Sequence, residues 1–265
     1  MTFLISLNIV NSWLDKMERD HLGVKKGVTI EGVQVERLLP GELREVIEEI
    51  AIQVQKLPVE PSIDKQTGAI LPEKPGMVIN VEDSVNQILA AAEGDTVKLK
   101  RVKVQPRYKK ESLEQARNCL GNYATGFRGS GERYKNISVA CYSINHTIIW
   151  PGEEFSFNET TGPRTPERGY LPAPVIIGGS FGMDYGGGVC QVSSTLYNAA
   201  LNAHLPIVER HAHSKPIHYV PPGKDATVSY GDQDLRFRNN RTGPLIIKAS
   251  MYRGRISAEI WGGNN

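Results

Sequence analysis

Apolar residues recur at helical spacing in the first third of the chain. Between residues 40 and 54 they fall at positions i, i+3, i+4, i+7, i+8 and i+11, while glutamates occupy the opposite face. This period predicts an amphipathic helix that begins at Pro40 and ends before Pro58. A second helix is predicted over residues 80–92. The apolar positions of the two stripes are Leu43, Val46, Ile47, Ile50, Ala51 and Val54, then Val81, Val85, Ile88 and Leu89.

Short runs rich in β-branched residues surround these helices and predict strands. Residues 61–75 are rich in turn formers, and Asp64–Gly68 suits a hairpin. Residues 27–107 therefore read as a small α+β domain, and no histidine, cysteine or acid pair in it suggests chemistry. The predicted strands are Gly27–Ile30 and Val33–Val35 with a turn at Gly32, then Pro75–Ile79 and Thr96–Val104.

The second half is richer in glycine, proline and aromatic residues. Helices are predicted over Ser112–Thr125, with Ser112 as the N-cap, over Tyr134–Ile148 and over Gln191–Ala203. Pro151–Asn158 predicts a turn and a short strand, and residues 226–261 predict antiparallel strands. The expected fold class is α+β: the small N-terminal domain precedes a mixed α/β domain over residues 108–265, in which a cysteine-bearing helix packs on an antiparallel sheet.

Residues 1–26 allow two interpretations. Met1–Val10 is apolar but too short to cross a bilayer, which takes about 20 residues, and charged residues follow at once. The segment is either the remnant of a membrane anchor or an amphipathic helix over Phe3–Met17 that packs on the body. The first alternative predicts membrane association through the N-terminal segment.

Composition narrows the function classes. With 265 residues, 40% hydrophobic and 23% charged, the chain can bury a substantial core and is neither disordered nor a coiled coil. The net charge of only +2 gives too little electrostatic attraction to bind a polyanion, so nucleic acid is not expected as a partner. The cysteines are Cys119, Cys141 and Cys190, and this odd number without a CxxC pair argues against a structural zinc site and a disulfide framework.

The strongest chemical signal is the run Gly186-Gly187-Gly188-Val189-Cys190-Gln191. Three glycines oppose helix formation while the following residues favour it, so Cys190 should lie in the first turn of a helix. Free backbone N–H groups and the helix dipole there favour the thiolate, which is the nucleophilic form of cysteine. The glycines allow a ligand to approach the backbone, and the amide of Cys190 or Gln191 is a candidate oxyanion donor.

A thiol nucleophile requires a base, and two histidines follow at a suitable separation. His211 and His213 alternate by two on a predicted strand, so they share a face. One of them is the candidate base, and Asp225, Asp232 or Asp234 is the candidate group that orients the imidazole. This order of Cys, His and Asp is similar to that of transglutaminase-like and papain-like folds, as a likeness of topology only.

Competing interpretations exist for each of these residues. Cys190 is alternatively a packed small hydrophobe, as Cys119 and Cys141 are expected to be. A zinc ion held by His211 and His213 is disfavoured because only Cys190 or His218 lies at a suitable spacing to be a third ligand, and no metal or cofactor is predicted. The candidate substrate-binding residues are Gly186, Gly187, Gly188, Ser193, Ser194, Arg164 and Tyr170, with Arg164 able to bind the carboxylate of a peptide.

Several ordered motifs together resemble the VanW family, over about Tyr134–Trp261. The motifs are Pro151–Asn158, Thr161–Arg164, Gly169-Tyr170, Gly186–Ala199, Glu209–Ser214 and Gly223–Val228. The preceding region, around Pro75–Val85, resembles the peptidoglycan-binding-like domain that often stands before VanW. The resemblance implies a bacterial protein of the extracytoplasmic cell envelope with peptidoglycan or its stem peptides as partner.

Two functions follow from these observations. The first is a Cys190-dependent acyl-transfer enzyme, a hydrolase or transpeptidase acting on stem peptides, with His213 or His211 as base and Asp225 as the orienting group. The second is a non-catalytic module that binds the wall. Reactivity of Cys190 toward electrophiles distinguishes them.

Overall fold

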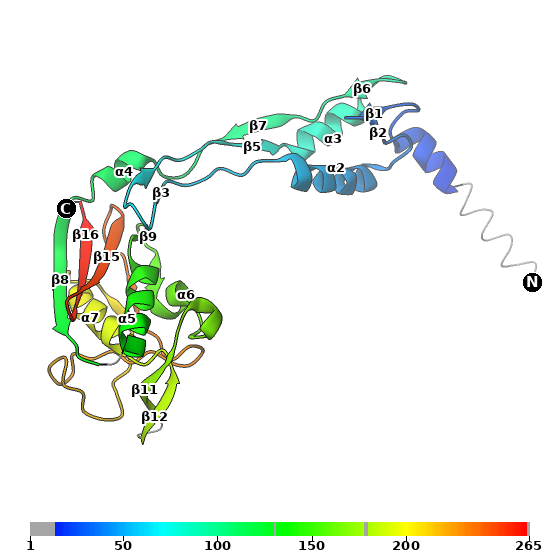
Figure 1. The fold of residues 1–265 in the computed structure, drawn as a ribbon. Coiled ribbons are helices and arrows are strands. Elements are labelled where there is room, and N and C mark those ends of the chain that lie inside the picture. The colour runs from blue at the N-terminus through cyan, green and yellow to red at the C-terminus, as the bar shows by residue number, and fades with distance from the viewer. Residues whose placement is uncertain (1–13, 130, 178–179, 264–265) are drawn as a thin grey trace, which may run out of the picture. The chain divides into compact units, whose positions relative to one another are not determined.

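The computed structural model describes residues 14–129, 131–177 and 180–263, and the chain forms two compact units (Figure 1). The first unit comprises the chain up to Glu60 together with Glu73–Arg107, and the second comprises Pro61–Pro72 together with the chain from Tyr108 onward. The predicted N-terminal helix Phe3–Met17 and the anchor segment lie largely outside the described residues, although residues 14–22 are helical. Within the described part of the chain, no helix combines the length and apolarity needed to cross a membrane.

The first unit is built from the two predicted amphipathic helices and short strands. α2 (Pro40–Val54) and α3 (Val81–Leu89) pack on each other, and the fully buried Leu43, Ile47 and Ile88 lie in their shared core. β1 (Thr29–Ile30) pairs antiparallel with β2 (Val33–Gln34) and parallel with β6 (Thr96–Val97), and β5 (Gly76–Ile79) pairs antiparallel with β7 (Arg101–Val104). The expected strand over Thr96–Val104 is thus two strands in different sheets.

The second unit is organised around an antiparallel sheet with the strand order β8-β16-β15-β9. Helices α5 (Gly131–Ile144) and α7 (Val189–Asn202) pack on it and on each other. The α+β class is therefore confirmed, including the cysteine-bearing helix on an antiparallel sheet. The strands are β8 (Asn118–Gly126), β9 (Thr147–Ile149), β15 (Leu245–Tyr252) and β16 (Arg255–Gly262).

Glycine allows α7 to approach this sheet closely. A Cβ added at Gly121 of β8 would lie 2.3 Å from the backbone nitrogen of Ala203 and 2.4 Å from the carbonyl oxygen of Ala199. No side chain fits there, so the backbones of β8 and α7 are in direct contact. The buried face of α7, which includes Val192 and Leu196, then lies in the core of the unit.

Smaller elements surround this core. β10 (Glu154–Ser156), β14 (Arg236–Arg238) and β13 (Ile207–Glu209) form an antiparallel sheet in the order β10-β14-β13. The hairpin predicted around Asp64–Gly68 is confirmed by β3 (Ser62–Ile63) and β4 (Ile70–Leu71). The rest are α4 (Lys110–Glu114), α6 (Phe157–Thr161), η1 (Pro166–Arg168) and the hairpin of β11 (Pro172–Ile177) with β12 (Ser180–Tyr185).

Four expected elements of the second unit differ from the structure. The strand expected to carry both His211 and His213 ends at Glu209, and His211 makes only an isolated bridge to Thr227. The helix expected over Ser112–Thr125 is wrong, because only α4 is helical there and the rest is β8, whose tertiary pairing with β16 outweighs local helix preference. The helix expected to reach Ile148 ends at Ile144, where the backbone reverses at His146 with φ +58°. The strand expected over residues 226–230 makes only isolated bridges.

Candidate functional site

Cys190 occupies the first turn of α7, as the glycine run predicts. Gly188 is the N-cap residue and has φ +108°, a value that side chains rarely adopt. Cys190 is partly exposed, whereas Cys141 is buried in the core. The sulfur of Cys190 therefore stands at the positive end of a 14-residue helix.

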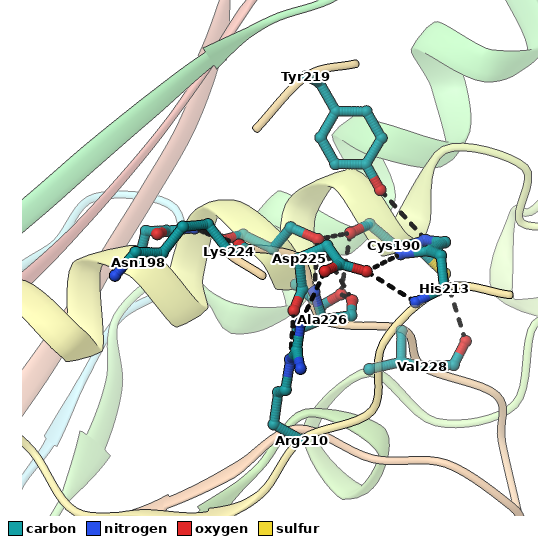
Figure 2. Close-up of polar contacts among 11 residues, drawn as sticks. Cys190, Asn198, Arg210, His213, Tyr219, Lys224, Asp225, Ala226 and Val228 are labelled. Atoms are coloured by element: carbon teal, nitrogen blue, oxygen red, sulfur yellow. Dashed lines mark hydrogen bonds and ion pairs between the residues drawn. The ribbon is translucent and has the colours of Figure 1, made fainter. Parts of the chain in front are cut away.

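The imidazole of His213 lies beside this sulfur. The two groups interact electrostatically, and Figure 2 shows Cys190 next to the ring. Sγ of Cys190 donates a hydrogen bond to the backbone carbonyl of Val228 at 3.5 Å. Nδ1 of His213 lies 2.6 Å from Oδ2 of Asp225, and the other ring nitrogen, Nε2, lies 3.3 Å from the hydroxyl of Tyr219. Only 8% of the His213 side chain is exposed, so this arrangement is sheltered from water.

Asp225 is held by several donors at once. Oδ2 also accepts the backbone N–H of His213 at 2.7 Å, and Oδ1 accepts Nη2 of Arg210 at 2.6 Å. Nε of Arg210 donates to the backbone carbonyl of Asp225, also at 2.6 Å (Figure 2). Although burial acts to raise the pKa of Asp225, the bonds from His213 and the charge of Arg210 outweigh it and hold that pKa below its ordinary value.

The thiol of Cys190 and the imidazole of His213 change each other's pKa. Burial acts to raise the pKa of Cys190, but the neighbouring His213, the backbone of Val228 and the charge of Arg164 leave that pKa lowered. Burial acts to lower the pKa of His213, but the neighbouring Cys190 and the bond to Asp225 leave it raised. Both directions favour a thiolate beside an imidazolium, which is the reactive form of a cysteine nucleophile.

Polar residues of α7 attach the segment that carries Asp225. Oγ of Ser193 donates to the carbonyl of Ala226 at 2.6 Å, and the N–H of Ala226 donates to Oγ of Ser194 at 2.9 Å. Nδ2 of Asn198 donates to the carbonyl of Lys224 at 2.6 Å (Figure 2). Ser193 and Ser194, which the sequence suggests as ligand contacts, are fully buried in these bonds and therefore place Asp225 relative to Cys190.

The other sequence candidates lie in different surroundings. Nε2 of His211 is 2.9 Å from Glu209, and Asp234 accepts Oγ of Ser156 at 2.5 Å; these two side chains are thus engaged elsewhere. Asp232 is exposed. Tyr170 is fully buried in the core, which leaves it no surface for a substrate.

The amide of Gln191 is also engaged. It donates to the carbonyl of Gly188 at 3.0 Å, so it is not available to an oxyanion in this conformation. The Gln191 side chain is buried, with Nε2 donating to the carbonyl of Gly126 at 2.8 Å and Oε1 accepting Nη2 of Arg133 at 2.8 Å. The N–H of Cys190 remains in the first turn, where helix amides have no intrahelical acceptor.

Three residues near the sulfur are not singled out by sequence reasoning. Arg210 holds Asp225, Arg133 interacts electrostatically with Cys190, and the hydroxyl of Tyr219 lies 3.3 Å from Nε2 of His213. Arg133 precedes Ile137 by four residues on α5, so helical spacing places it on the buried face that packs toward α7. Tyr219 stands in a proline-rich loop with no periodic pattern to mark it.

A metal site is not assembled from these groups. Among the described residues, no three His, Cys, Asp or Glu side chains gather so that they could hold an ion. A cavity of about 470 Å³ lies elsewhere in the second unit, with His146, Lys248 and Trp261 among its lining residues, and none of the candidate site residues borders it.

Comparison with known proteins gives the family. The family model described as VanW-like protein matches residues 132–261. The uncharacterized protein YoaR of Bacillus subtilis (strain 168) is 34% identical over 220 residues, which cover 81% of this chain and 72% of YoaR. The chain belongs to the VanW-like family. No solved structure matches it.

A second VanW-like relative carries a functional name. The Vancomycin B-type resistance protein VanW of Enterococcus faecalis (strain ATCC 700802 / V583) is 32% identical over 150 residues, which cover 54% of this chain and 54% of that protein. The VanW match contains Cys190, His213, Asp225 and Arg210, so the whole candidate site lies inside the family region. The match begins at residue 132, after the first unit.

Proposed function

We propose that this VanW-like protein is a cysteine-dependent acyl-transfer enzyme of the bacterial cell envelope that acts on peptidoglycan stem peptides. The observation that carries the proposal is the arrangement of Cys190, His213 and Asp225 at the N-terminus of α7. The envelope context is supported by family membership and by a relative named for vancomycin resistance. The first unit is proposed to bind the wall, and membrane association is proposed for the N-terminal segment.

The side chains support a two-step reaction. The Cys190 thiolate attacks the carbonyl carbon of a peptide bond, a C–S bond forms and the carbonyl electron pair moves onto oxygen. When the tetrahedral intermediate collapses, the C–N bond breaks and the leaving amine takes a proton from the His213 imidazolium. His213 then removes a proton from water, or from an acceptor amine, which attacks the thioester and releases Cys190 as thiolate.

Asp225 and Tyr219 have supporting roles in this reaction. Asp225 fixes the tautomer and the plane of the imidazole and stabilises its cationic form, as the orienting acid of a triad does. The phenol of Tyr219 lies beside Nε2, and burial raises its pKa, so it stays protonated. Its oxygen can accept a hydrogen bond from Nε2–H of the imidazolium, and its hydroxyl can donate to Nε2 of the neutral ring.

Thiol labelling tests the nucleophile directly. Iodoacetamide at neutral pH is expected to alkylate Cys190 faster than the exposed Cys119, because the Cys190 pKa is lowered. Cys141 should be the slowest, because burial raises its pKa to about 12. Peptide mapping by mass spectrometry gives the three rates, and equal slow labelling of all three would contradict the proposal.

Turnover is tested on purified peptidoglycan. Wild-type protein should change the muropeptide pattern, and both Cys190→Ala and His213→Gln should abolish the change. Wall binding without any altered muropeptide, and unaffected by Cys190→Ala, would instead support the non-catalytic module.

A further inference from the structure

Two arginine side chains pass over the glycines that precede the thiol. A Cβ added at Gly186 would lie 2.7 Å from Cγ of Arg164, and one added at Gly188 would lie 3.1 Å from Cγ of Arg133. The glycine run thus provides space for an arginine stem on each side of the segment that leads into Cys190. This is a physical role for the glycines beyond the turn that they make.

Each of these arginines is held by a buried amide side chain. Nη2 of Arg164 donates to Oδ1 of Asn158 at 2.7 Å, and Nδ2 of Asn158 is fixed in turn by the carbonyls of Ser229 at 3.0 Å and Gln233 at 2.8 Å. Because both hydrogens of this amide nitrogen have backbone acceptors, Oδ1 has a fixed direction. Arg164 is therefore positioned by a neutral group.

The side-chain amide of Gln191 holds Arg133 as that of Asn158 holds Arg164. Nη2 donates to Oε1 of Gln191 at 2.8 Å, and Nε2 of Gln191 is fixed by Oγ1 of Thr125 at 3.1 Å and the carbonyl of Gly126 at 2.8 Å. Gln191 directly follows the candidate nucleophile, so the same helical turn places both the sulfur and this guanidinium.

Two guanidinium groups act electrostatically on the sulfur, and the carboxylate of Asp234 also acts on Arg164. The hydrogen bonds that the structure gives Arg164 go to the Gly162 carbonyl, at 2.7 Å, and to Asn158, both of which are neutral oxygens. Its guanidinium also lies 5.8 Å from the ring centroid of Phe157 and 6.0 Å from that of Tyr230, which shields it in part from water.

We propose that Arg164 and Arg133 form a carboxylate-binding site beside Cys190, so that the substrate is a peptide whose free carboxylate lies close to the carbonyl group that the thiolate attacks. This inference rests on the proposed function and narrows its substrate class. Guanidinium groups bind carboxylates with paired, charge-assisted hydrogen bonds, and a positively lined site raises the local concentration of anions. Neutral peptides of the same length should be poor substrates.

A pair of alkylating agents that differ in charge tests the site without a known substrate. Iodoacetate carries a carboxylate next to its reactive carbon, and iodoacetamide is its neutral analogue. The ratio of their rates at one thiol cancels the fraction of thiolate, and Cys119 in the same molecule gives the reference ratio. The iodoacetate-to-iodoacetamide ratio at Cys190 is expected to exceed that at Cys119 by about tenfold at low ionic strength.

Variants assign this preference to the arginines. Arg164→Gln and Arg133→Gln should each lower the ratio at Cys190 toward that of Cys119, whereas Arg164→Lys should keep much of it because the charge remains. Arg238→Gln is the matched control, since the Arg238 side chain is 54% exposed and pairs with Glu154. A circular dichroism spectrum checks the fold of each variant.

The outcomes separate this inference from the proposed function. If iodoacetamide labels Cys190 rapidly but the ratio equals that of Cys119, or if neither glutamine variant lowers it, the carboxylate site is refuted while the nucleophile stands. If neither reagent labels Cys190 in the wild-type protein, the nucleophile itself is refuted and the carboxylate site falls with it.

Discussion

His213 and Asp225 are joined by two bonds to one oxygen: Oδ2 of Asp225 accepts the backbone N–H of His213 at 2.7 Å and lies 2.6 Å from Nδ1 of its ring. The carboxylate thereby fixes both the position of the histidine backbone and the orientation of its imidazole. With Arg210 on the other oxygen, Asp225 cannot turn away without breaking an ion pair whose side chains are largely buried.

Asp225→Asn should reduce the reactivity of Cys190. Without the carboxylate, the pKa of His213 falls, the thiolate loses its imidazolium partner, and the pKa of Cys190 rises. The midpoint of the pH profile for iodoacetamide labelling of Cys190 should therefore move to higher pH. Asp232→Asn, an exposed aspartate in the same region, is the control and should leave the profile unchanged.

The same carboxylate predicts how acid affects stability. The pKa of Asp225 is lower in the folded protein than in the unfolded chain, where it has the ordinary aspartate value of about 3.9. The ionised side chain therefore adds fully to the free energy of unfolding above that ordinary value, and this contribution is lost as the pH falls through the lower, folded-state value. Urea unfolding of the wild type should show a loss of stability as the pH is lowered from about 4. Asp225→Asn should lose less over the same pH range, and an equal loss in both proteins would contradict the assignment.

Gly121→Ala should destabilise the second unit. The added methyl group meets the backbone of α7 at 2.3 Å and 2.4 Å, and backbone cannot move aside as a flexible side chain can. Overpacking of this kind costs about 1–3 kcal/mol, measurable as a lower urea midpoint. Gly126→Ala on the same strand is the control, because nothing lies within 4 Å of its added Cβ; comparable losses in both variants would count against a direct β8–α7 backbone contact.

Gly186→Ala should be more harmful than Gly223→Ala, although both glycines have positive φ, +85° and +76°. The backbone penalty for a side chain at left-handed φ, about 1–2 kcal/mol, is common to the two. Only at Gly186 does the new Cβ meet Arg164, at 2.7 Å, while Gly223 has open space. Urea denaturation should show the difference, and Gly186→Ala should also lower the iodoacetate preference of Cys190.

Helix α2 of the first unit offers a comparison within one element. Ile47→Ala removes a fully buried side chain and should cost about 2–5 kcal/mol of unfolding free energy. Ile52→Ala, at a position that is 75% exposed, should change it by less than about 0.5 kcal/mol. Chemical denaturation of the two variants gives these changes in unfolding free energy. Equal changes would mean that the apolar face of α2 that carries Ile47 is not the buried face.

The amino-acid sequence by itself determines the local features of this protein. The apolar stripe of α2, the hairpin after Ser62 and the helix that begins just before Cys190 follow from periodicity and from glycine and proline positions, which act within a few residues. The α+β class follows from the same signals, and so does the expectation that Cys190 stands where backbone amides favour a thiolate.

Tertiary structure alone decides the rest, because the decisive contacts join residues far apart in the chain. Strand β8 forms where local preference favours a helix, since its pairing with β16 and its contact with α7 outweigh that preference. Asp225 rather than Asp232 or Asp234 meets His213, because buried serines of α7 fix the segment around Ala226. The stems of Arg164 and Arg133 pack over Gly186 and Gly188, and long-range packing of this kind has no sequence period.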